Sequence, residues 1–276
     1  MAKNDEDKKL AKPAPAEKAL AQSHDYGEFA GVGYEGQSNE DIAMPFIGIL
    51  QSLSPEVTDG DPKFMKEAKV GDLINTVTHQ RYSGDKGVFV VPVLTKHVYV
   101  EWVPRNKGGG FVGIHELDSD IVKTAKATAE NFNRLQTGEN DLIESFYIYG
   151  LQLENPQSED HMGAVVLAFT STKIKVYKRI MTQLRTVKGN PPLFAHRLLV
   201  LTKGEKNKQN QPYRNFDIAP ALGTVAESMI SPSGDQGGLL SAAMDLHKMV
   251  AAGKTKVDYN AQAAGGATAE GEETPF

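Results

Sequence analysis

The sequence predicts a mainly β protein with inserted helices, an α+β fold, flanked by flexible N- and C-terminal tails. Three observations predict it. Short apolar runs punctuated by Gly, Pro and Asn dominate the middle of the chain, a few segments carry apolar residues at helical spacing, and both ends lack apolar periodicity. The length of 276 residues is sufficient to bury a sizeable core.

The domain organisation follows from where this periodicity begins and ends. Residues 1–40 mix Lys, Asp and Glu with Ala and Pro, and they predict a flexible N-terminal arm. Residues 41–252 predict one folded domain. Residues 253–276 are rich in Ala, Gly, Thr and Glu, and they predict a disordered acidic C-terminal tail.

Strands are expected at eight positions of the folded domain. Each position is a short run of β-branched, aromatic or aliphatic residues bounded by turn residues. In chain order the runs cover residues 46–53, 72–77, 87–94, 97–103, 143–154, 163–169, 194–202 and 213–218. The polar residues 203–212 between the last two runs predict a long hairpin.

Three helices are expected among these strands. Ser119 can cap a helix over residues 119–135, Ser171 can cap a second helix, and residues 236–252 predict a third, amphipathic helix. The apolar face of the second helix is formed by Ile174, Tyr177, Ile180, Met181 and Leu184. Many short strands with few helices favour an OB-fold-like β-barrel core, although a β-sandwich would give much the same pattern.

Composition and end sequences exclude several classes of protein. The chain has no cysteine, which excludes disulfides, thiolate zinc sites and a cysteine nucleophile. The first ten residues are rich in charge and no apolar stretch follows them, so neither a secretory signal nor a membrane-spanning helix is expected. The default expectation is therefore a cytoplasmic location.

Catalytic and metal-binding signals are weak. A G-x-G-x-x-G pattern at residues 31–36 has no strand before it and no helix after it, so it does not fit dinucleotide binding. The histidines lack metal-ligand spacing. Glu139, Asp141 and Glu144 fit a solvated acidic turn better than an acid/base pair. The sequence predicts a protein that is not an enzyme and uses no metal or cofactor.

Charge is distributed unevenly along the chain. The formal net charge is −5, yet residues 161–214 hold eleven Lys or Arg residues against a single acid, Glu205. This segment therefore carries +10 and the rest of the chain −15. A basic segment with so little opposing charge predicts a polyanionic partner.

Two segments combine cations with aromatic rings, the mixture that binds the phosphates and stacks the bases of single-stranded nucleic acid. In the first, the glycines at residues 108–110 allow close approach of the backbone to a ligand. The candidate binding residues of the first segment are Tyr99, Trp102, Arg105, Lys107 and Phe111. Those of the second segment are Lys173, Lys175, Lys178, Arg179, Arg185, Lys188, Arg197, Lys203, Tyr213 and Arg214.

The aromatic residues also have a structural interpretation. Strand aromatics such as Trp102 and Phe216 are core residues more often than stacking platforms, and Tyr177 is expected to pack on the apolar face of its helix. The cations fit an ordinary solvated surface less well, because such surfaces intersperse both signs of charge.

The C-terminal tail carries the most specific motif. Its last seven residues include Glu270, Glu272, Glu273, Pro275 and Phe276. This ending resembles the acidic C-terminal tip of bacterial and phage single-stranded DNA-binding proteins, which closes with carboxylates followed by Pro-Phe. The resemblance implies an OB-fold core, a coating role in replication and recombination, and recruitment of partner proteins through the tail. A merely solubilising acidic tail is the alternative.

The combined hypothesis is a phage single-stranded DNA-binding protein that coats unwound DNA in replication and recombination in the host cytoplasm. Its expected partners are single-stranded DNA and, through the tail, replication or recombination proteins. A homo-oligomer is left open, and no membrane partner is expected. Two alternatives remain: a strand-annealing or RNA-binding protein with the same charge layout, and a virion or scaffold protein whose basic face packs against other subunits.

Overall fold

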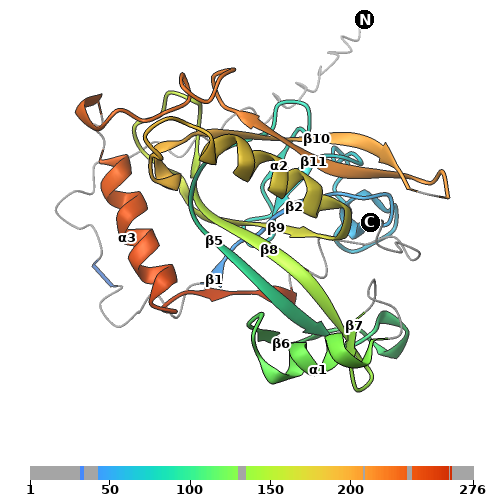
Figure 1. The fold of residues 1–276 in the computed structure, drawn as a ribbon. Coiled ribbons are helices and arrows are strands. Elements are labelled where there is room, and N and C mark those ends of the chain that lie inside the picture. Colours follow the sequence, from blue (N-terminus) through green and yellow to red (C-terminus); the bar gives the residue numbers. More distant parts are fainter. Residues whose placement is uncertain are drawn as a thin grey trace, which may run out of the picture. The chain divides into compact units, whose positions relative to one another are not determined.

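The structure is a computed structural model that describes residues 32–33, 43–129, 135–207, 209–234, 238–260 and 262. The chain divides into two units, Met1–Gln37 and Ser38–Phe276, and the described helices and strands lie in the second unit. The described strands are β1 (Ala43–Met44), β2 (Ile47–Ile49), β3 (Leu73–Asn75), β4 (Arg81–Tyr82), β5 (Val88–Trp102), β6 (Phe111–His115), β7 (Leu135–Thr137), β8 (Asn140–Leu153), β9 (Gly163–Thr170), β10 (Leu198–Lys206), β11 (Pro212–Pro220) and β12 (Lys256–Val257) (Figure 1). The described α-helices are α1 (Asp120–Thr128), α2 (Ile174–Arg185) and α3 (Leu239–Ala251).

The described strands form three sheets. The largest is antiparallel and has the order β11-β10-β5-β8-β7, with β6 paired to β5 and β9 paired to β8. A small antiparallel sheet has the order β2-β3-β4, and β1 pairs with β12 in parallel. The fold of the described residues is thus mainly β with three α-helices, which confirms the predicted α+β class.

The long ladder between β5 and β8 is the backbone of the largest sheet. It runs from the Phe89–Leu153 pair to the Trp102–Asp141 pair and is interrupted once, by a register shift between Pro92 and Leu94. The extra residue of such a bulge exchanges the two faces of a strand, because side chains alternate with a period of two. Val91 before the shift and Val98 after it therefore belong to one apolar cluster, together with Val93 at the bulge itself.

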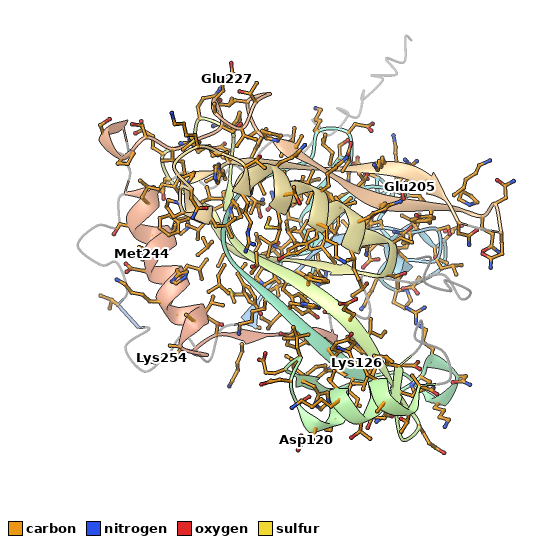
Figure 2. All side chains as sticks on the ribbon, viewed as in Figure 1. Asp120, Lys126, Glu205, Glu227, Met244 and Lys254 are labelled. Carbon is orange, nitrogen blue, oxygen red and sulfur yellow. The ribbon has the colours of Figure 1, made fainter. Side chains whose placement is uncertain are left out.

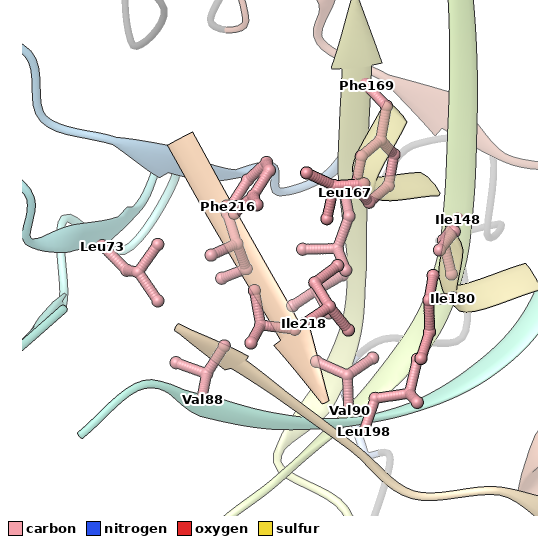
Figure 3. Close-up of a cluster of buried hydrophobic side chains, with 14 of the residues drawn as sticks. Leu73, Val88, Val90, Ile148, Leu167, Phe169, Ile180, Leu198, Phe216 and Ile218 are labelled. Carbon is pink, nitrogen blue, oxygen red and sulfur yellow. The ribbon is translucent and has the colours of Figure 1, made fainter. Parts of the chain in front are cut away.

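One face of the ladder is covered by α2. Val176, Ile180 and Leu184 on α2 are buried against Phe146 and Ile148 of β8. Strands β9, β10 and β11 and the β2-β3 pair contribute to the same cluster (Figure 3). The cluster residues labelled in Figure 3 are Leu73, Val88, Val90, Ile148, Leu167, Phe169, Ile180, Leu198, Phe216 and Ile218.

The other face of the ladder is covered by α3 and by the segment that follows it. Leu239, Ala243, Leu246 and Val250 on α3 are buried against β5 and β8. Beyond α3, Tyr259 packs edge-on to Phe46 and Tyr147, at centroid separations of 5.9 and 5.8 Å. Ring contacts with the α3 side therefore continue past residue 252, the predicted end of the folded domain.

A third, smaller cluster lies at the end of the ladder, where α1 packs on β5, β7 and β8. Its buried residues are Tyr99, Val122, Ala125, Leu135 and Leu142. The Ser119 side chain caps α1 by accepting a hydrogen bond of 3.4 Å from the backbone N–H of Val122, as the sequence predicted.

The OB-type barrel is not confirmed, because the sheets of the described residues do not close into a barrel. Two contacts nevertheless reach across from the small sheet to the edges of the large one. Phe46 forms an isolated parallel bridge with Val166 of β9. The side-chain amide of Gln51 donates to the backbone carbonyl of Arg214 on β11 at 2.8 Å and accepts from its N–H at 3.0 Å.

The predicted helices differ from the observed ones at their ends, and one predicted cap is wrong. Helix α1 ends at Thr128, before the predicted end at residue 135, which lies in β7. Ser171 does not cap α2: residues Ser171–Lys173 form a 3-10 turn, and α2 begins at Ile174. Ser171 has a φ of 49°, and its buried hydroxyl has no hydrogen-bond partner among the described residues. The predicted apolar face of α2 is confirmed, and α3 lies within the range predicted for the last helix.

Most predicted strands lie near their expected positions, with two differences. The runs at residues 87–94 and 97–103 form one continuous strand, β5. Phe194, expected in a strand, lies in a 3-10 turn (Leu193–Ala195) before β10. The predicted hairpin is confirmed by the β10–β11 ladder. Within the described residues, every helix is too short or too polar to span a membrane.

Gly150 on β8 provides a test of how tightly the ladder packs. It lies opposite Pro92, and a Cβ atom at this position would lie 2.6 Å from both Val90 Cγ1 and the Val91 carbonyl oxygen. We expect Gly150→Ala to lower the free energy of unfolding by about 1–3 kcal/mol, because the backbone on one side cannot yield. Urea unfolding followed by circular dichroism measures this.

Gly113 on β6 is the matched control for this substitution. A Cβ atom there would come no closer than 3.7 Å to a neighbouring atom. Gly113→Ala is therefore expected to change the free energy of unfolding by less than about 0.5 kcal/mol. Equal losses in the two variants would contradict the tight packing assigned to the ladder at Gly150.

Candidate nucleic-acid interface

The solvent-facing side of α2 carries a line of basic residues. Because every third or fourth residue of α2 is buried in the core, the residues between them face outward. The exposed cations of this surface, together with one in the turn after the helix, are Lys175, Lys178, Arg179, Arg185 and Lys188. We call this set the α2 face.

The cations of the α2 face differ in how far they are already paired. Lys175 Nζ lies 2.7 Å from Glu205, and Arg179 lies 2.8 Å from Asp217. Lys178 Nζ lies 5.9 Å from the centroid of the Phe146 ring. In the described part of the chain, neither Arg185 nor Lys188 forms an ion pair with an acid. The C-terminal half of the α2 face is therefore the part most open to an anion.

Glu205 on β10 is the centre of a polar cluster beside α2. Its Oε2 atom accepts hydrogen bonds from Tyr213 at 2.6 Å, Lys175 at 2.7 Å and Asn215 at 3.0 Å. Burial alone would raise the pKa of Glu205, but these hydrogen bonds and the charge of Lys175 outweigh it and lower the pKa to about 2. Lys203 Nζ lies 3.4 Å from the other carboxylate oxygen.

Three further cations of the second segment, Lys173, Arg197 and Arg214, are partly buried. Lys173 is partly buried, with its Nζ 5.6 Å from the centroid of the Phe216 ring. Arg197 is partly buried, and its backbone bonds to Ser228 and Ala221. Arg214 is partly buried and lies so close to Gly71 that a Cβ atom there would be 3.0 Å from its Nε. These three cations are therefore packed against the protein and are less exposed than those of the α2 face.

The aromatic residues of the first segment are packed against other rings or cations. Tyr99 is 7% exposed, and Lys126 Nζ lies 4.8 Å from its ring centroid. Trp102 is partly buried and meets Phe111 edge-on at 5.8 Å. Phe111 stacks on Tyr259 with a centroid separation of 4.8 Å and an interplanar angle of 14°. Tyr259 was not identified from the sequence.

The charged residues around this first segment also have local partners. Arg105 and Lys107 are exposed in a 3-10 turn, and Lys107 Nζ lies 2.8 Å from Glu139. The hydrogen bond and charge of Lys107 lower the pKa of Glu139. Asp141 accepts a hydrogen bond from Gln136, and Glu144 bonds to His97. Glu139 lies in the turn before β8, as predicted, whereas Asp141 and Glu144 lie on β8 itself, so the predicted acidic turn is confirmed only at Glu139.

The structure places the rings of Trp102 and Phe111 and the cations of α2 on opposite faces of the β5–β8 ladder, whereas Tyr99 packs against α1. Trp102 and Phe111 belong to the α3 side, with Tyr259. Lys178 lies above Phe146, which belongs to the α2 side. The ring of Trp102 and the cations of α2 therefore do not form one continuous surface within the described residues.

A different aromatic side chain, His97, lies on the α2 side. Its imidazole stacks on Phe146 with a centroid separation of 3.8 Å, and its side chain remains 32% exposed. Phe146 is thus a shared neighbour of His97 and Lys178. His97 and Trp102 both lie in the predicted run 97–103, so the alternation of residues along that run already places them on opposite faces.

The C-terminal motif lies outside the described residues. Glu270, Glu272, Glu273, Pro275 and Phe276 are all in this part of the chain. The preceding segment is placed, and it is bound to the α3 side: Asn260 accepts a hydrogen bond from the Phe111 N–H, and Gln262 accepts one from the Tyr147 hydroxyl. Among the described residues, no group of three or more His, Asp or Glu side chains is arranged to hold a metal ion.

These features define a mainly β, α+β protein with a basic helix face on one side of its central ladder. The chain belongs to the Pam3 phage gp34-like protein family, whose model matches residues 15–256. Membership in this family supports the expected association with phage. No curated protein and no solved structure matches the chain.

The Glu205 cluster makes stability depend on pH in a predictable direction. The pKa of Glu205 is about 2 in the folded protein against an ordinary 4.5. A carboxylate with a lowered folded pKa stabilises the fold above its unfolded pKa, and this contribution is lost as pH falls through the folded pKa. We expect the melting temperature of the wild type to exceed that of Glu205→Gln at pH 7, and the difference to shrink between about pH 4.5 and pH 2. A difference that stays constant over this range would contradict the assignment.

Proposed function

We propose that this protein binds single-stranded DNA through the α2 face, as a phage single-stranded DNA-binding protein acting in replication and recombination. The observation that carries the proposal is the exposed line of cations on α2, whose members Arg185 and Lys188 have no acidic partner among the described residues. The +10 charge of residues 161–214 supports it, since phosphate neutralisation dominates such binding.

The spacing of the cations suits a strand that runs along the helix. Lys178 and Arg185 are seven residues apart, a rise of about 10 Å along an α-helix, so both can meet the same extended backbone. His97 supplies a partly exposed ring near Lys178, on which a base can stack. The mixture of cations and a ring required for sequence-tolerant binding is therefore available on this side.

Two further parts of the proposal rest on the resemblance to single-stranded DNA-binding proteins. The OB-type core is supported by the Phe46–Val166 bridge and by the Gln51–Arg214 hydrogen bonds, which link the small sheet to β9 and β11. The C-terminal carboxylates and Pro275-Phe276 are proposed to dock onto a replication partner, with the ring in an apolar pocket and the carboxylates facing basic residues.

A structural subunit is the second candidate, and a separate observation favours it. Val112 and Ile114 on β6 are 45% and 41% exposed, and Ile143 on β8 is 37% exposed. Ile114 and Ile143 both pair with Val100 and therefore lie on the same side of the sheet. Self-association without affinity for any polynucleotide would favour this candidate over DNA binding.

Charge reversal at Arg185 tests the α2 face. We expect Arg185→Glu to weaken binding of an oligo-dT strand and to reduce the slope of log affinity against log salt by about 0.7 for each lost phosphate contact. The measurement is a fluorescence anisotropy titration at several salt concentrations. Lys254→Glu, three residues after the end of α3, makes the same change in net charge elsewhere (Figure 2). Equal losses in both variants would mean that net charge, and not the α2 face, determines binding.

Substitution of the two rings tests which side stacks with bases. His97→Ala is expected to weaken strand binding by about 1–3 kcal/mol with little change in the salt slope. Trp102→Ala is expected to lower the melting temperature while leaving the affinity unchanged, because Trp102 packs against Phe111 on the other side. The reverse pattern would assign the stacking platform to Trp102.

Removal of residues 270–276 tests the tail. We expect the melting temperature to remain that of the full chain, and recovery of phage or host replication proteins in a pull-down to be lost. Deletion of Phe276 alone should also abolish recovery without altering the salt dependence of DNA binding, because it removes a ring and leaves the glutamates. Equal recovery by the full and shortened chains would contradict a docking role.

A further inference from the structure

Glu205 lies where donors from three elements converge on one point. Lys175 comes from α2, Lys203 from β10, and Tyr213 and Asn215 from β11. Three of these donors lie within 3.0 Å of Glu205 Oε2, and Lys203 Nζ lies 3.4 Å from Oε1. Two ammonium groups, a phenol and an amide around one oxyanion are also suitable donors for a phosphate group.

The Glu205 carboxylate that accepts these bonds is fixed in the sheet, whereas one of its donors, the Lys175 ammonium group, is exposed to solvent. The Glu205 side chain is 16% exposed and belongs to the β10–β11 ladder, where it lies opposite Tyr213. The Lys175 side chain is 61% exposed. Exposed ion pairs contribute little to stability, so an incoming phosphate can compete for Lys175.

Glu205 is also the only acid within the basic segment of residues 161–214. Its hydrogen-bond donors hold the Glu205 carboxylate in place beside α2. A carboxylate in this place does reduce the number of cations that a polyanion can reach, because Lys175 and Lys203 are both engaged by it. Its effect is therefore to limit anion binding next to the α2 face.

We propose that Glu205 is a built-in competitor for a phosphate site formed by Lys175, Lys203, Tyr213 and Asn215. This inference rests on the proposed function for the identity of the polyanion, a single strand, but the anion site itself does not depend on it. In the wild type the carboxylate occupies the site and weakens strand binding. Removal of its charge opens the site to a backbone phosphate.

The test compares the salt dependence of oligo-dT binding by the wild type and Glu205→Gln. The glutamine can still accept hydrogen bonds from Tyr213 and Asn215, which preserves the local structure, while the ammonium groups of Lys175 and Lys203 lose their ion pair with residue 205 and become available to a phosphate. We expect several-fold tighter binding at low salt and a log-log slope steeper by about 0.7–1.4, which corresponds to one or two additional phosphates. An unchanged slope in a folded Glu205→Gln protein that binds DNA would overturn the inference and leave the proposed function standing.

Two further variants complete the comparison. Asp245→Asn on α3 removes one negative charge and releases Lys248, which lies 3.2 Å from it, so it matches Glu205→Gln in charge on the other side of the ladder. It is expected to leave the slope unchanged, and an equal gain would overturn the inference. If Glu205→Gln does not fold, Glu205→Asp retains the charge on a shorter side chain. For Glu205→Asp we then expect a log-log salt slope steeper than that of the wild type by less than the 0.7–1.4 expected for Glu205→Gln. A slope equal to that of the wild type would overturn the inference.

Inorganic phosphate tests the anion site without any nucleic acid. We expect phosphate, but not chloride at equal ionic strength, to raise the melting temperature of Glu205→Ala more than that of the wild type. Tyr213→Phe in the same background should reduce this gain, because one donor is lost. A phosphate effect in a protein that does not bind DNA would retain the anion site and reject the proposed function. Equal phosphate effects in Glu205→Ala and the wild type would reject the anion site.

Discussion

The antiparallel ladder between β5 and β8 is the constraint on which the other described elements depend. The other five strands of the largest sheet are attached to these two, four of them directly and β11 through β10, and both faces of the ladder are apolar. Such a strand pair needs a cover on each side, because exposed apolar faces are costly in water. Helix α2 provides one cover and α3 the other. The bulge between Pro92 and Leu94 allows valines from both halves of β5 to face the α3 side.

This two-sided arrangement also separates the exposed cations from the packed aromatic rings. The α3 side is closed by rings, with Tyr259 between Phe46, Phe111 and Tyr147. The α2 side has apolar residues beneath the helix and cations above it. The period of two along β5 accounts for this separation, because Trp102 and His97 lie five residues apart and therefore point to opposite sides.

The sequence predicted the elements well and their assembly only in part. The apolar spacing in α2 and the capping role of Ser119 were both correct, because they depend on local physical chemistry. Two strands were predicted where β5 is continuous, since the polar Thr95 and Lys96 between the two runs interrupt the apolar pattern but do not end the strand. Glu205 was counted as an isolated acid. Its partners Tyr213 and Asn215 become its neighbours only through the hairpin register, and Lys175 only through the packing of α2.

The β10–β11 hairpin is attached unevenly to the rest of the sheet. Strand β10 pairs with β5 only from Leu198 to Val200, and the Thr202 N–H bonds to Gly84, whereas the hairpin ladder continues to Lys206. Within the described residues, the outer part of the hairpin has no strand paired beside it on the β5 side. It contacts the rest of the fold through side chains, chiefly those of Glu205 and Asp217, which pair with cations of α2. Backbone amides on one strand therefore have two different opening free energies: those near Leu198 exchange with solvent only when the sheet opens, and those near Lys206 exchange through local fraying.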